Sequence, residues 1–134
     1  MVEYAQQNDL SDIQAFDHLS PQMLIKAVEN RRVLVFKTAN VVMGIARWNY
    51  FWDSIPFLNM LYVPSGYTHS GVGTALLTFW ESEMRSQGYS RVFTSTMANE
   101  RGQHFFRKHG YQDIGNLYDY DEGGGLELIL EKRF

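Results

Sequence analysis

The spacing of apolar side chains predicts two well-defined helices in this chain. In the first, Leu24, Ala27 and Val28 recur at intervals of three and four residues, which places them on one buried stripe. Ser20 has the side chain of a helix N-cap, and Pro21 suits the first turn, where its missing N–H is not needed. We therefore expect a helix that begins after Ser20 and ends at residues 30–32.

The second helix has the clearest pattern in the chain and is expected at residues 74–87. Glu81, Glu83 and Arg85 are available to face water, opposite an apolar face. Gly88 follows at the position where a left-handed residue closes a helix. The apolar face consists of Ala75, Leu76, Phe79, Trp80 and Met84.

Runs of β-branched and aromatic residues predict a central sheet. Residues 33–37 and 41–48 suit a hairpin, and a polar and aromatic connection at residues 49–54 leads to a strand at residues 57–63. The order of the elements indicates an α+β, or mixed α/β, domain. The remaining elements are short helices at residues 11–16 and 99–108, strands at residues 2–5, 91–97 and 126–131, and a glycine-rich turn at residues 121–125.

Composition restricts the chain to one domain and few classes of partner. A length of 134 residues with 45% hydrophobic content supports one core, so residues 1–134 are expected to form a single domain. A net charge of -3 with interspersed charges gives no concentrated positive field for nucleic acid or a membrane surface. Without a signal-peptide pattern or an apolar run of about 20 residues, we expect a cytoplasmic protein. The absence of cysteine excludes thiolate metal sites and S-acyl-enzyme intermediates.

A loop at residues 64–73 precedes the long helix and has the character of an anion site. Unpaired amides at a helix N-terminus carry partial positive charge, which suits a phosphate or pyrophosphate, and His69 and Ser70 add side-chain donors. The loop lacks the lysine of a P-loop, and Leu76 stands where a dinucleotide fingerprint needs a third small residue. Taken alone, Gly71 and Gly73 suit a tight turn into a helix equally well.

A second motif lies at residues 99–111 and contains Asn99, Gly102, the aromatic pair Phe105 and Phe106, and the step from Gly110 to Tyr111. In this spacing the chain resembles the GNAT family of N-acetyltransferases. The earlier loop is also similar to that family's pyrophosphate signature, with Thr68, Gly71 and Gly73 at its fixed positions. Thr68 departs from the usual Arg or Gln, so the backbone amides must carry more of the phosphate binding. The resemblance covers residues 41–111 best.

The resemblance implies a GNAT-like fold, with a mostly antiparallel, splayed central sheet flanked by helices, and acetyl-CoA as the acyl donor. Its pantetheine arm would lie between the fourth and fifth strands, where open backbone groups need partners. Asn99 would contact that arm, with Phe106 packed nearby. The other implied cofactor contacts are Leu61, Tyr62 and Val63 for the arm, and Thr68, His69, Ser70, Gly71, Val72, Gly73 and Thr74 for the pyrophosphate.

The implied reaction is direct transfer of acetyl to a primary amine of a small molecule or peptide. It needs a neutral amine, donors for the developing oxyanion and an acid for the leaving thiolate. Many GNAT enzymes use a Tyr at the position of Phe106, so Tyr118 is favoured here as the acid, ahead of Tyr111 and Tyr120. Unassisted departure of the thiolate is the alternative, because its pKa lies not far above neutral.

The base and the acceptor pocket are less defined. Asn59 stands where some relatives carry a Glu, and the thioester is expected near it, but an amide cannot take a proton. Asp53, acting through a water, is the candidate base, although an exposed loop aspartate is more often only solvated. Trp48, Tyr50 and Asp53 are expected to border the acceptor.

Phe106 and Asn59 also support a rival hypothesis: a GNAT-like sensor or interaction module that binds acyl-CoA without turnover. A third hypothesis, an unrelated α+β binding domain, requires both motifs to be coincidental. We expect no metal site, because His104 and His109 are five residues apart and lack the His-Glu-x-x-His arrangement. The acceptor's identity and the formation of a homodimer are left open.

Overall fold

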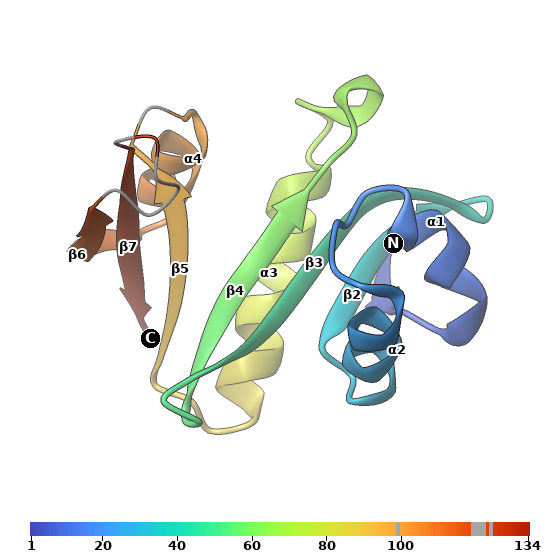
Figure 1. Cartoon of the computed structure of the whole chain (residues 1–134), viewed down its shortest axis with the longest axis horizontal. Helices are drawn as coiled ribbons and strands as arrows, with labels where there is room; N and C mark the ends of the chain where they lie inside the picture. The colour runs from blue at the N-terminus through green and yellow to red at the C-terminus, as the bar shows by residue number, and fades with distance from the viewer. Residues whose placement is uncertain (99, 119–122, 124) are drawn as a thin grey trace.

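The computed structural model describes residues 1–98, 100–118, 123 and 125–134. One seven-stranded sheet has the order β1-β2-β3-β4-β5-β7-β6 (Figure 1). All neighbouring strands are antiparallel except β4 and β5, which are parallel, so the predicted α+β fold with a mostly antiparallel sheet is confirmed. The strands are β1 (Val2–Tyr4), β2 (Val33–Thr38), β3 (Val41–Phe51), β4 (Ile55–Tyr62), β5 (Arg91–Met97), β6 (Gln112–Tyr118) and β7 (Leu126–Arg133).

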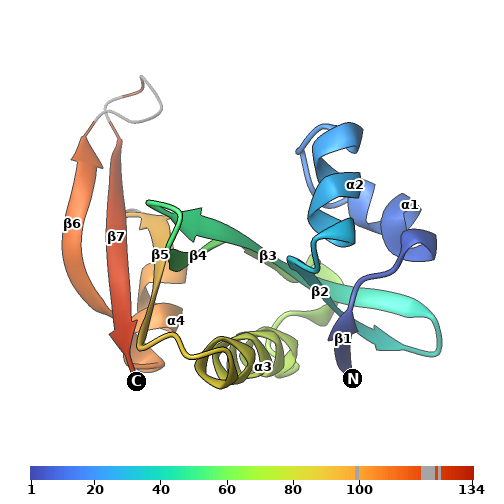
Figure 2. The same ribbon diagram turned by 90° about the horizontal axis from the view of Figure 1, so that it is seen from below.

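Helices lie on both faces of the sheet. Figure 2 shows α1 (Leu10–Gln14) and α2 (Pro21–Glu29) over one face, with α3 (Val72–Ser86) and α4 (Gly102–Lys108) on the opposite face. Short 3-10 turns precede α1 (Gln7–Asp9) and α3 (Ser65–Tyr67). Successive side chains of β2 point to opposite faces of the sheet and contribute to both cores. Val33 and Val35 pack in the core under α1 and α2, while Leu34 packs toward α3.

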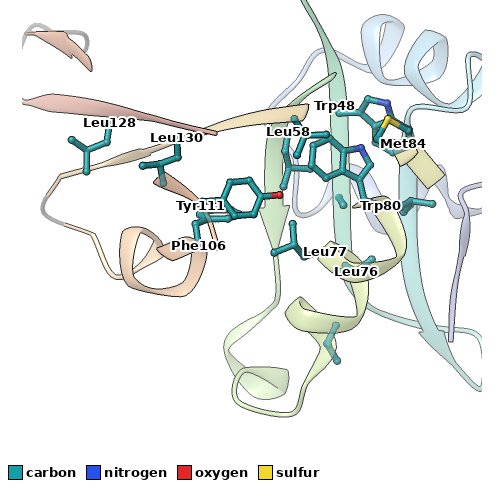
Figure 3. Packing of buried hydrophobic residues seen from close by; sticks show 14 residues of the cluster. Trp48, Leu58, Leu76, Leu77, Trp80, Met84, Phe106, Tyr111, Leu128 and Leu130 are labelled. Carbon is teal, nitrogen blue, oxygen red and sulfur yellow. The ribbon is translucent and has the colours of Figure 1, made fainter. Parts of the chain in front are cut away.

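The larger core lies between α3 and the sheet (Figure 3). Trp48 and Trp80 meet there with ring centroids 6.1 Å apart, and both side chains are buried. Gly44 on β3 allows the close approach of α3, because an added Cβ would lie 2.7 Å from Cγ1 of Val72. Trp48 was predicted to border the acceptor pocket, but its side chain is buried in this core.

The helix signals in the sequence are largely confirmed. The Ser20 side chain accepts a hydrogen bond from the Met23 N–H at 3.4 Å and so caps α2. Gly88 follows α3 with φ 96°, in the predicted left-handed conformation. The predicted cap Asn99 lies outside the described residues, as do Tyr120 and most of the predicted glycine-rich turn.

The connection predicted at residues 49–54 is too long, because β3 continues to Phe51 and β4 begins at Ile55. Trp52 and Asp53 make the tight turn with φ 52° and 60°. Asp tolerates the left-handed conformation, but Trp does not favour it, and the glycine usual in such hairpin turns is missing.

Glu81 on α3 was expected to face water, but it is only 8% exposed. Its carboxylate accepts a hydrogen bond from the Tyr111 hydroxyl at 2.7 Å and pairs with the Lys132 ammonium at 2.9 Å. Burial, followed by the neighbouring Glu81 charge, raises the pKa of Tyr111 far above its ordinary value of 10.0. These contacts join α3 to the strands on the far side of the β4–β5 junction, so the buried charge has partners.

Candidate functional site

Strand β4 has a strand partner on both sides in its first half only. It pairs with β5 at Phe57 and Leu58, and no further β4–β5 pair occurs among the described residues. On the other side, Leu58 pairs with Trp48 and Met60 with the adjacent Arg47, so Asn59 is the extra residue of a β-bulge. A bulge bends a strand and re-aims its side chains. Beyond it the two strands diverge (Figure 1), which confirms the predicted splay.

A cleft of about 350 Å³ occupies this divergence. Its walls are residues 58–62 of β4 and residues 94–97 of β5, and Phe106 of α4 also lines it. At its closed end the Thr94 hydroxyl donates to the Leu58 carbonyl at 3.0 Å. The cleft thus brings together Asn59, Leu61, Tyr62 and Phe106, as predicted from the resemblance, while Val63 lies beyond it.

The loop before α3 forms a second hollow of about 400 Å³, which Val63 lines. Gly71 occupies the N-cap of α3 with φ 88° and no side chain caps the helix, so the first amides of α3 have no capping partner. Val72 is buried in the core and offers only its backbone. The predicted loop residues that line the hollow are Thr68, His69, Gly71, Gly73 and Thr74.

Two side chains of this loop hold the loop itself together. The Thr68 hydroxyl donates to the Ser65 carbonyl at 3.0 Å, and the Ser70 hydroxyl donates to the Tyr67 carbonyl. The Ser70 hydroxyl was predicted to donate to a phosphate, but in this structure it donates its proton to the Tyr67 carbonyl instead. The backbone amides remain the donors.

Lys108 lines the same hollow from α4 and was missed in the sequence. It supplies the positive charge that Thr68 lacks, from about 40 positions further along the chain. The neighbouring His109 forms a hydrogen bond of 3.3 Å with the Thr74 hydroxyl and packs at a tilt against Phe105, with ring centroids 4.5 Å apart. The residue type gave no signal, because a lysine at a helix C-terminus is ordinary.

A groove of about 730 Å³ lies on the other side of the splay. Tyr50 lines it, as predicted, whereas Asp53 is exposed on the β3–β4 turn and is not among its lining residues. The cleft and the groove share three lining residues, Asn59, Ser95 and Glu127. These three therefore mark the junction where a cofactor in the cleft would meet an acceptor in the groove.

Glu127 is the one ionisable residue of this junction, and the sequence analysis missed it. It lies on β7, where it pairs with Met97 of β5 and Leu117 of β6. Its strand alternates, with Leu128 and Leu130 buried and Glu127 half-buried on the other face. The alternation alone predicts an outward-facing side chain, and only the pairing of β7 with β5 brings it to the cleft.

The tyrosines predicted as acids are elsewhere. Tyr118 is 80% exposed at the end of β6 and is not among the residues that line the cleft or the groove. Tyr111 is buried, and its proton is held by Glu81. Tyr62 is the tyrosine that lines the cleft, and it packs on Phe16 with ring centroids 5.7 Å apart.

Within the described ranges, no group of three or more His, Cys, Asp or Glu side chains is placed to hold a metal ion. No helix in the part of the chain that the structure describes is both long enough and apolar enough to cross a membrane.

Comparison with known proteins gives a consistent family. The acetyltransferase (GNAT) family model matches residues 3–111. A GNAT-family acetyltransferase from Bacillus cereus has a similar structure, with 24% identity, a TM-score of 0.81 and coverage of 99% of this chain and 96% of that chain. The ribosomal-protein-alanine N-acetyltransferase from Brucella melitensis has 19% identity, a TM-score of 0.86 and coverage of 100% and 99%.

The PaiA N-acetyltransferase from Thermoplasma acidophilum, solved in complex with coenzyme A, has 18% identity, a TM-score of 0.81 and coverage of 100% and 98%. At these identities the structures show a shared fold. No functionally curated protein matches the sequence.

Proposed function

The chain belongs to the acetyltransferase (GNAT) family, and we propose that it acetylates a primary amine held where the cleft and the groove meet. The observation that carries the proposal is the junction of Asn59, Ser95 and Glu127, which both hollows share. A transfer reaction needs donor and acceptor side by side, and a shared wall provides that.

The chain's own groups fit acetyl-CoA. The edge of β4 at residues 59–62 has no strand partner on the side of β5, and the backbone groups of such an open edge can pair with the amides of a pantetheine arm. The uncapped amides of α3 and the Lys108 ammonium suit the pyrophosphate. A structural relative was solved with coenzyme A, which supports this assignment.

We assign Glu127 as the proton acceptor for the amine. A carboxylate at the junction attracts an ammonium ion and takes its proton, directly or through one water, which frees the nitrogen lone pair. Acetyl-CoA supplies the acetyl group: the nitrogen bonds to the acetyl carbon, the carbon–sulfur bond breaks, and the electron pair leaves on sulfur. Asn59 cannot accept a proton, but its amide lies at the same junction and can orient the acceptor.

Position 106 holds a phenylalanine and not the tyrosine that could act as the general acid. In this proposal the thiolate therefore leaves without a side chain that donates a proton to it. Such departure is feasible because a thiol ionises near pH 8.5. Backbone N–H groups on the open edge of β4 provide the donors for the developing oxyanion, which is where preorganised amides contribute most.

The test is Glu127→Gln, with Asp53→Asn as the matched control. Release of CoA from acetyl-CoA and a panel of primary amines is measured at neutral pH. Removing a general base costs about 10²- to 10⁴-fold in rate, so Glu127→Gln should lose activity by that factor. Asp53→Asn should retain it, because Asp53 is exposed on the turn and lies outside the groove lining.

Acetyl-CoA should still raise the unfolding temperature of Glu127→Gln, since a ligand that binds the native state stabilises it. A Glu127→Gln variant as active as wild type, beside an inactive Asp53→Asn variant, would reverse the assignment. Absence of CoA release from the wild type, with acetyl-CoA binding intact, would favour the non-catalytic acyl-CoA sensor.

A further inference from the structure

The acceptor groove is mostly aromatic and aliphatic, and its wall combines residues of five strands, β3 to β7, and of the β3–β4 turn. Its apolar lining residues are Tyr50, Phe51, Trp52, Phe57, Leu117 and Ile129. Three of them remain well exposed in the structure: Phe51 at 36%, Trp52 at 78% and Leu117 at 50%. Large apolar side chains gathered around one hollow mark a binding surface more often than isolated ones do.

Two ionisable side chains other than tyrosine line the groove, Glu127 and His18. Glu127 is its only carboxylate, and no lysine or arginine occurs among its described lining residues. A ligand with an ammonium group is attracted to this carboxylate and to the faces of the aromatic rings. A ligand that also carries a carboxylate meets repulsion from Glu127, and no lysine or arginine lines the described groove to offset it.

The conformation of Trp52 adds a second, independent observation. Its φ of 52° is left-handed, which is unusual for a bulky side chain, and the turn places it beside Phe51 with ring centroids 4.7 Å apart. Left-handed backbone at a non-glycine residue costs about 1–2 kcal/mol. Ala39 and Asn40 have the same conformation in the β2–β3 turn, so it belongs to the tight hairpin turns, and here the turn holds an exposed aromatic ring at the rim of the groove.

We infer that the acceptor is a small arylalkylamine or alkylamine, with one primary ammonium group, an apolar body and no carboxylate. This inference rests on the proposed function and narrows its acceptor. The ammonium end is placed at Glu127, and the apolar body extends toward Phe51 and Trp52.

The test compares four acceptors at saturating acetyl-CoA by CoA release: phenethylamine, phenylalanine, ethylamine and a tetrapeptide with an N-terminal alanine. Phenethylamine and phenylalanine differ by the carboxylate alone, and we expect at least about a 100-fold preference in kcat/KM for phenethylamine. Ethylamine lacks the ring and should be about 10- to 200-fold poorer than phenethylamine.

Trp52→Asn then tests the rim. Asn tolerates a left-handed turn, so this variant should fold with an unchanged or higher unfolding temperature, yet lose most of the preference for phenethylamine over ethylamine. Trp52→Phe, which keeps a ring, should retain the preference. A fall in unfolding temperature with an unchanged preference would show that Trp52 has a structural role only, and would overturn its role in recognition.

The outcomes separate this inference from the proposed function. Equal turnover of phenylalanine, or preference for the tetrapeptide, overturns the inference and leaves the acetyltransferase assignment standing. Acetyl-CoA binding without acetylation of any amine in the panel overturns the inference as well. No acetyl-CoA binding at all would instead contradict the proposed cofactor site.

Discussion

The two halves of β4 have the same neighbour on one side and different surroundings on the other. Residues 55–58 pair with β3, and Phe57 and Leu58 among them also pair with β5, whereas residues 60–62 pair with β3 alone. Leu58 in the first half is 2% exposed, and Tyr62 at the end of the second half is 40% exposed. The bulge at Asn59 separates the halves.

This difference shows how one strand serves both stability and binding. The first half satisfies its backbone groups inside the sheet, so its side chains contribute to the core. The second half keeps one edge open beside a cleft, and that edge gains its partners from a ligand. Mutations on the two sides of Asn59 should therefore separate stability from acetyl-CoA binding.

The largest expected effect comes from Leu58→Ala. Deleting a fully buried leucine side chain should lower the free energy of unfolding by about 2–5 kcal/mol. Leu61→Ala, in the half-buried second half, should cost less than about 1.5 kcal/mol, because its side chain loses less buried area. Urea unfolding measures both. Equal losses at the two positions would contradict the division of β4 into a core half and a binding half.

A smaller effect is expected where α3 is tied to the β5–β7 side of the splay. The pKa of Tyr111 is raised in the folded state by burial and by Glu81, so this tyrosine stabilises the fold fully below pH 10.0. Above pH 10.0 the unfolded chain releases the proton and the folded chain retains it, so stability falls as pH rises, by about 1.4 kcal/mol per pH unit.

Tyr111→Phe should remove that contribution to the slope, although it lowers stability at neutral pH by about 1–3 kcal/mol through the lost hydrogen bond to Glu81. Chemical unfolding of wild type and variant between pH 9 and about pH 11.5 gives the two slopes. Identical slopes would mean that Tyr111 ionises in the folded protein as it does in the unfolded chain.

A change in stability of similar size is expected at Gly71, together with a large change in binding. A β-branched residue is strained at φ 88°, so Gly71→Val should cost about 1–3 kcal/mol and reorient the first amides of α3. Wild type at 100 times the Kd of acetyl-CoA gains about 2.7 kcal/mol, and Gly71→Val should gain almost none.

Gly66→Ala is the matched control for Gly71→Val. It lies in the same loop, where an added Cβ meets nothing within 4 Å and φ is not left-handed. Its thermal shift with acetyl-CoA should equal that of wild type. A full shift in Gly71→Val would show that the α3 amides do not bind the cofactor.

The sequence predicted the parts of the fold that depend on local chemistry. The α2 cap at Ser20, the left-handed Gly88 and the strands around the splay follow from residue type and spacing. The connection between β3 and β4 was predicted but not its tight form, because Trp52 does not favour the left-handed conformation that the turn has there.

The cofactor side of the site was predictable and the acceptor side was not. Gly71 and Phe106 belong to contiguous motifs, so spacing alone located the loop and the cleft. Glu127 and Lys108 reach the site only through β7–β5 pairing and the docking of α4, which are contacts between distant segments. Glu81 shows the same limitation, since its burial depends on Tyr111 and Lys132.

The central claim is that the open edge of β4 binds acetyl-CoA, and amide hydrogen exchange tests it most directly. With saturating CoA or acetyl-CoA, amides at residues 59–62 and at the start of α3 should exchange more slowly, because exchange requires breaking their new hydrogen bonds. Amides of Phe57 and Leu58 should change little, because β4 is paired with both β3 and β5 at these two residues. Protection that is absent from residues 59–62, in a protein that binds CoA, would contradict the account.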